Sequence, residues 1–160
     1  MAIAVLFILT AGAFVYSQRL KREPLVIDRV DFVALGVSPS VQGSNLFSPN
    51  SDCRKDRMGI YFRTTRSDQM DVEVLGRRGE LVRTLASDRF FKRYREHLLI
   101  WDGRTNRGRV APTGRYSVQI TMRGLDRVLE LPGRIRLRNF ESPDSACPGG
   151  GTADREAGQA

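Results

Sequence analysis

Residues 100–120 read IWDGRTNRGRVAPTGRYSVQI, and turn-forming residues recur in them at short intervals between two β-like runs. Asp102-Gly103 predicts a turn, because glycine accepts a positive φ and the aspartate side chain caps nearby amides. Trp101 ends the first run, where its large area makes it an expected core anchor. The stretch therefore predicts two strands joined by a folded loop, with further turns at Asn106-Gly108 and Thr113-Gly114.

Alternation of apolar and polar residues continues on both sides of this stretch. In MDVEVLG (70–76), Met70, Val72 and Val74 share one face, as in a strand with one side buried. Short strands at this spacing, separated by turn signals, predict an all-β antiparallel sandwich. About seven strands are expected, at 59–65, 70–76, 80–86, 96–103, 115–122, 127–133 and 134–138. Segment 87–95 predicts either a loop or the edge of a strand. The expected core comprises Ile60, Phe62, Val72, Val74, Leu81, Leu85, Leu99, Trp101, Tyr116, Val118 and Ile120.

The stretch from Trp101 resembles the W-D-G-x-x-x-x-G-x-x-x-x-x-G-x-Y signature of the immunoglobulin-like domain of flagellar hook-capping proteins. Upstream, FSPNSDCRKDRMGIYF is similar to the F-S-P-N-x-D opening that precedes such domains, although the family often has N-G-D-G where this chain has Asn50-Ser51-Asp52-Cys53. VEVLGRRGELVRTL matches a further strand and turn. The resemblance covers about residues 47–138 and implies an immunoglobulin- or fibronectin-III-like accessory module of exported proteins, without implying a flagellar role. The signature residues are Phe47, Ser48, Pro49, Trp101, Asp102, Gly103, Gly108, Gly114 and Tyr116.

The N-terminal run AIAVLFILTAGAFVY (2–16) is apolar and uncharged and is followed by RLKR. As a helix it would span about 22 Å, against the ~30 Å hydrocarbon core of a bilayer. Residues 1–18 therefore predict a marginal transmembrane anchor, or a signal segment, because Ala11-Gly12-Ala13 has the small-x-small form of a cleavage site. The expected organisation is this segment, a juxtamembrane linker over 19–46 with an additional strand or stalk in LVIDRVDFVAL, a sandwich over 47–140, and a disordered tail over 141–160.

The charge of the chain points to anionic partners. The net charge is +8, and residues 51–140 hold 21 basic and 11 acidic side chains. The first expectation is a single-pass protein of the cell membrane whose domain lies outside the cytoplasm, as a spacer or as a binder of a protein or an anionic envelope polymer. The basic flank after the apolar run favours the alternative, a cytoplasm-facing adaptor contacting anionic lipid or nucleic acid. Nucleic acid is not an expected partner of an exported domain.

Few residues suggest chemistry. Asn50, Asp52 and Asp56 have a spacing that could surround Ca²⁺, which would make the module a calcium-stabilised adhesion domain, although a polar loop is the alternative. His97, the single histidine, lies in a strand pattern without catalytic partners and is expected to be structural. We therefore expect no enzymatic activity and no cofactor beyond this calcium. Cys53 and Cys147 could form one disulfide in an oxidising compartment. An anionic-ligand patch, or else a solvated loop, is expected at Phe90, Phe91, Lys92, Arg93, Tyr94 and Arg95.

Overall fold

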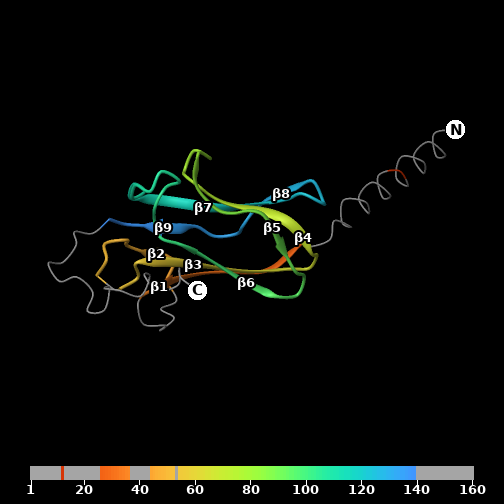
Figure 1. Cartoon of the computed structure of the whole chain (residues 1–160), viewed down its shortest axis with the longest axis horizontal. Coiled ribbons are helices and arrows are strands. Elements are labelled where there is room, and N and C mark those ends of the chain that lie inside the picture. Colours follow the sequence, from red (N-terminus) through yellow and green to blue (C-terminus); the bar gives the residue numbers. More distant parts are fainter. Residues whose placement is uncertain (1–11, 13–25, 37–43, 53, 140–160) are drawn as a thin grey trace, which may run out of the picture.

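The computed structural model describes residues 12, 26–36, 44–52 and 54–139. These residues build an all-β domain of two sheets in a sandwich-like arrangement, and the sheets lie one above the other in Figure 1. Within this part of the chain, no helix is long and apolar enough to cross a membrane. The predicted anchor over 1–18, the predicted tail over 141–160, and Cys53 and Cys147 lie outside the described residues.

The smaller sheet has three antiparallel strands in the order β1-β3-β6. They are β1 (Ile27–Leu35), β3 (Arg57–Thr64) and β6 (Glu96–Trp101). Strand β1 comes from the segment that was expected to hold an additional strand or a stalk. It pairs with β3 at eight positions, so the strand alternative is confirmed and the sandwich begins upstream of residue 47.

The larger sheet has six strands, with β2-β9-β7-β4-β5 in order and β8 paired with the end of β7. Their bounds are β2 (Leu46–Phe47), β4 (Asp68–Leu75), β5 (Leu81–Phe91), β7 (Gly114–Met122), β8 (Arg127–Glu130) and β9 (Ile135–Leu137). The two-residue β2 runs parallel to β9. All seven expected strands are present, and β1 and β2 bring the number within the described residues to nine.

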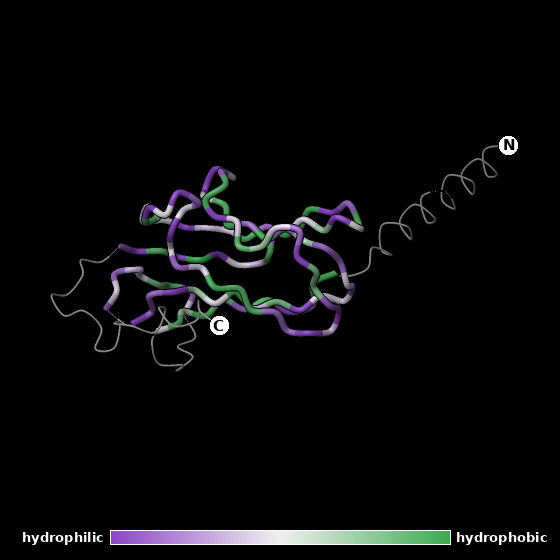
Figure 2. The backbone as a smooth tube through the Cα atoms, viewed as in Figure 1, coloured by the Kyte–Doolittle hydropathy of each residue, from purple (hydrophilic) through white to green (hydrophobic). Residues whose placement is uncertain are grey.

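The core lies between the two sheets and follows the period-two pattern of the sequence (Figure 2). The smaller sheet contributes Ile60, Phe62 and Trp101, and the larger sheet contributes alternate residues of β4 and β7. Most of the expected core is buried, and Leu85 is half-buried. Leu81 was expected in the core and is 51% exposed. The prediction was wrong because a register shift places Leu81 opposite Leu75, whose side chain leaves the sheet on the outer face.

Segment 87–95 is partly strand, because β5 continues to Phe91. Four residues of β5, from Ala86 to Arg89, lie opposite three of β4, from Met70 to Val72, which defines a β-bulge. Asp88 lies in the bulge and has φ +49°. Its backbone N–H donates a hydrogen bond to Asp71 Oδ1 at 2.7 Å. The bulge changes which side chains of β5 face inward. Apolar and polar residues therefore do not alternate regularly beyond residue 86, and the sequence pattern did not indicate a strand there.

Candidate functional site: a basic groove beside the 102–113 loop

Three signature aromatics meet where β6 ends and β7 begins. Phe47, Trp101 and Tyr116, the aromatic cluster, have ring centroids 5.3 Å apart for Phe47–Trp101 and 5.0 Å for Trp101–Tyr116, both edge-to-face. All three are buried. Trp101 Nε1–H donates to Arg104 O at 2.9 Å, and the Tyr116 hydroxyl donates to Pro112 O. Burial, and then the charge of Glu80, raises the pKa of Tyr116, so this hydroxyl keeps its proton. The cluster thus ties both ends of the 102–113 loop to the core.

The glycine of the W-D-G motif joins the two signature motifs. Gly103 has φ +73°, and a Cβ there would lie 2.7 Å from Cγ of Pro49 and 3.1 Å from Cε2 of Phe47. Its neighbour Asp102 accepts a hydrogen bond from Arg104 N–H at 3.0 Å. The F-S-P opening and the W-D-G turn therefore pack directly on each other, which is a structural role for the signature residues.

The 102–113 loop is also docked on the larger sheet. Asn106 N–H donates to Val82 O at 2.9 Å, and Asn106 Oδ1 accepts from Thr84 N–H at 2.9 Å. Arg83 Nη1 reaches Thr105 O at 3.1 Å from the same strand. These bonds cover the edge of β5 and fix the loop beside the outer face of the sheet.

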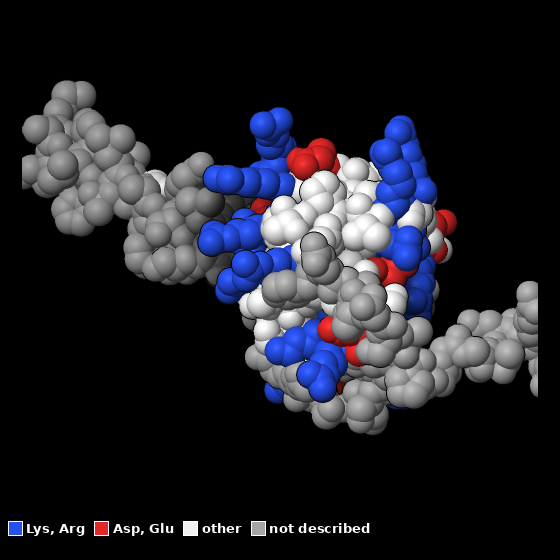
Figure 3. Space-filling view, turned by 90° about the vertical axis from the view of Figure 1, so that its left-hand side faces the viewer, with Lys and Arg blue, Asp and Glu red and all other residues white. Residues whose placement is uncertain are grey.

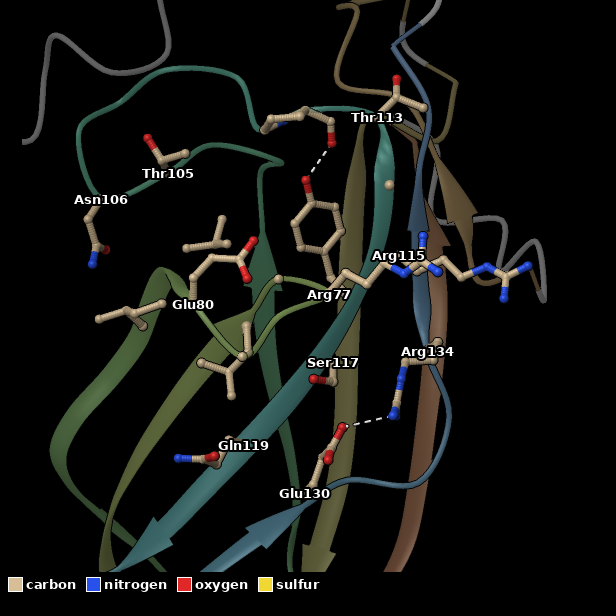
Figure 4. A pocket seen from close by; sticks show the side chains of 18 of the residues that line it. Arg77, Glu80, Thr105, Asn106, Thr113, Arg115, Ser117, Gln119, Glu130 and Arg134 are labelled. Atoms are coloured by element: carbon tan, nitrogen blue, oxygen red, sulfur yellow. Dashed lines mark hydrogen bonds and ion pairs between the residues drawn. The ribbon is translucent and has the colours of Figure 1, made fainter.

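An open groove of about 1450 Å³ lies between this loop, the 76–80 turn and the outer face of β7 (Figure 4). Ser117 and Gln119 of β7 are among its lining residues. Five arginines and two glutamates line it: Glu130 pairs with Arg134 at 3.0 Å, and Glu80 keeps its charge while it accepts a hydrogen bond from the Arg78 backbone N–H at 2.9 Å. The groove is therefore predominantly basic, with the arginines Arg77, Arg107, Arg109, Arg115 and Arg134 in its lining.

Positive charge is concentrated at this end of the domain. Seen end-on in Figure 3, Lys and Arg side chains stand along both flanks of this end. In the part of the chain that the structure describes, Arg77, Arg107, Arg109, Arg115 and Arg136 form no ion pair. At the opposite end Arg63 binds Asp28 at 2.6 Å and Arg123 binds Asp71 at 2.9 Å. The hydrogen bonds from these arginines lower the pKa of both carboxyls. Both ends therefore carry exposed basic side chains, and at the groove end five arginines stand beside one another without an acidic partner among the described residues.

The residues of segment 90–95 lie in two environments, because one is buried in the core and the others are exposed. Phe90 and Tyr94 are 63% and 64% exposed, and Arg93 lies over the Tyr94 ring at 5.6 Å. Phe91 is 1% exposed and packs on Phe62 with centroids 5.3 Å apart. Phe91 was expected in a surface patch, and that placement is wrong because the bulge in β5 turns it into the core. Lys92, Arg93 and Arg95 are exposed, so the rest of the patch stays a prediction.

His97 is half-buried, as expected for a structural histidine. Its ring packs against Phe91 at 5.0 Å and Phe62 at 5.6 Å, and its Nε2 is bonded to Lys92 O at 2.9 Å. The ring therefore supports the turn that leads from β5 to β6.

Two of the proposed calcium ligands, Asn50 and Asp52, form hydrogen bonds within a turn. Asn50 Nδ2 donates to Asp52 Oδ2 at 3.1 Å, and Asp52 Oδ1 accepts from Arg54 N–H at 2.7 Å. Asp56 precedes β3. Among the described residues, no group of three or more His, Cys, Asp or Glu side chains could hold a metal ion. The calcium hypothesis stays a prediction, and the bonds present are those of a polar turn.

Sequence reasoning did not single out Asn106 or the arginines of β7 and β9 as site residues. Alternation in RIRLR (134–138) predicted the strand, but only the pairing of Arg115 with Arg136 shows that charges of two strands adjoin. Comparison of the chain with protein-family models and with curated proteins finds no match. Fold and site together define a β-rich, two-sheet domain of about nine strands that carries a basic groove.

Proposed function

We propose that this chain is a non-enzymatic interaction module, an immunoglobulin-like sandwich held at the membrane by residues 1–18 and displayed outside the cytoplasm at the cell envelope. The observation that carries the proposal is the groove, in which a loop tied down at both ends holds arginines beside an open sheet face. Such an arrangement offers a preformed, charged surface for a partner.

The signature residues support the assignment to immunoglobulin-like accessory domains. Each aromatic of the cluster comes from a different part of the signature, and the three pack together with Gly103 and Pro49. These residues build the frame of the site, and the arginines around it supply the charge for binding.

The location is tested with two fusions after Ala160 of the full chain, one reporter active only outside the cytoplasm and the other only inside. We expect activity from the first and not from the second. The reverse result, with both fusions present at full length, would refute the external location. It would favour the alternative function, a cytoplasm-facing adaptor for anionic lipid or nucleic acid, which the Arg19, Lys21 and Arg22 flank supports.

The interaction role is tested separately from location. Purified full chain in a non-ionic detergent is titrated with polyanions of different chemistry, and binding that weakens with salt is expected. Absence of binding to every polyanion would remove the support that the groove gives and leave only a spacer role.

A further inference from the structure

Two arginines on neighbouring strands are aligned without an acidic partner. Arg115 of β7 and Arg136 of β9 are register partners in the antiparallel ladder, and both are exposed. Side chains at such positions start about 5 Å apart, and like charges there are destabilising. Because neither arginine forms an ion pair within the described chain, the fold places a repulsive pair at the border of the groove.

A third arginine, Arg134, directly precedes β9 and forms an ion pair with Glu130 at 3.0 Å. Ile135 and Leu137 are buried, so Arg134 and Arg136 share the outer face, about 6.6 Å apart for two residues of strand. We call Arg115, Arg134 and Arg136 the arginine stripe. In Figure 4 Arg115 extends from β7 across β9, and Arg134 lies further along the same side. A line of separate charges suits an elongated anion better than a small one, because a small anion needs donors that converge on one point.

The guanidinium groups of the stripe suit the oxygens of a phosphate or a carboxylate polyanion, and we take phosphate as the case to test. Guanidinium groups bind phosphate oxygens through two parallel hydrogen bonds. Sites for single-stranded nucleic acid add exposed aromatics on which bases stack. Here Tyr116 is buried, and exposed Phe90 pairs with Gln69, at the end of β4 remote from the stripe. Leu75, at the other end of β4, adjoins Ser117 on the side of the stripe. The length of β4, about 20 Å, therefore separates Phe90 from the stripe.

We propose that the arginine stripe and the groove bind a linear polymer of phosphodiester-linked polyols, a polyanion without bases. The inference rests on the proposed function of the domain as an interaction module and specifies its ligand. Arg115 and Arg136 contact successive phosphates of the polymer, whose charge removes the repulsion between them. Arg77, Arg107 and Arg109 border the polymer on the loop side.

The test uses the full chain in non-ionic detergent and lipid-free poly(glycerol phosphate), with calorimetric titration at several salt concentrations. The variant is R115Q/R136Q. The matched control, R66Q/R95Q, removes the same charge from exposed arginines at the opposite end, one of them in the 90–95 patch. We expect R115Q/R136Q to bind about tenfold more weakly, and the slope of log K against log salt to fall by about 1 per arginine. The control should stay within about twofold, and both variants should melt no lower than the parent.

Other outcomes would overturn the inference. Equal loss in both variants would mean that only net charge matters, and loss confined to R66Q/R95Q would move the site to the 90–95 patch. Equal or tighter binding of a single-stranded oligonucleotide or of poly-glutamate would refute the polyol phosphate. If the parent does not bind poly(glycerol phosphate) but binds another polyanion, the ligand is wrong and the interaction module stands. Failure with all polyanions would refute both.

Discussion

Replacement of Trp101 by alanine should destabilise the domain strongly. The side chain has no exposed surface and packs edge-to-face on Phe47 and Tyr116. A buried tryptophan removes about 200 Å² from water, worth about 5 kcal/mol at ~25 cal/mol per Å². Alanine still buries part of this area, and the surrounding side chains can close part of the cavity. The free energy of unfolding should therefore fall by about 3–5 kcal/mol. Trp101→Phe keeps a ring in place but loses the bond to Arg104 O, and about 1–2 kcal/mol should be lost.

The assay is urea unfolding of the full chain in non-ionic detergent, followed by far-ultraviolet circular dichroism. Fluorescence is unsuitable because Trp101 is the single tryptophan of the chain. The ranking alanine, phenylalanine, parent in increasing stability is the expected result. A loss below about 1 kcal/mol for Trp101→Ala would refute the reasoning that the aromatic cluster anchors the loop.

Three further predictions concern other parts of the frame. Gly103→Ala should cost about 2–4 kcal/mol in the same unfolding assay, because it adds a contact 2.7 Å from Pro49 to the strain of φ +73°. Gly79→Ala, at φ +81° with open space around it, should lose only about 1 kcal/mol, and equal losses would contradict the packing argument. Asp71 has a lowered folded pKa, mainly through its bond to Arg123, so its contribution to stability is present above its ordinary value of 3.8 and is lost as pH falls through the folded pKa. Asp71→Asn should flatten the acid limb of the curve of unfolding free energy against pH. An unchanged limb would show that the Asp71–Arg123 pair does not contribute to the pH dependence of stability. Millimolar Ca²⁺ should leave the melting temperature unchanged, because Asn50 and Asp52 already satisfy each other and the backbone; a rise abolished by Asp52→Asn would establish the calcium site.

Local patterns predicted the architecture because each strand carries its own period. Met70, Val72 and Val74 alternate in sequence and all face the core, and Asp102-Gly103 forms the turn that its residue types favour. These features depend on a few neighbouring residues, so they can be read without knowing the rest of the fold.

Features that depend on distant partners could not be predicted in this way. Leu81 and Phe91 depend on bulges in β5, where one extra residue reverses the direction of the side chains. Asn106 is a turn residue by type, but its bonds to Val82 and Thr84 need a strand more than twenty positions away. The arginine stripe likewise exists only because β7 and β9 pair in one particular register.

The direction of β1 has a mechanical consequence. Val26 precedes β1, whose first residue pairs with Thr64, at the end of β3 remote from Trp101 and the arginine stripe, and eight positions of β1 pair with β3. Tension between residue 26 and a polymer held at the stripe would run along the strands, at right angles to the ladder hydrogen bonds. Those bonds would then share the load in shear and would not open one at a time. We therefore expect the domain to resist pulling along its own length.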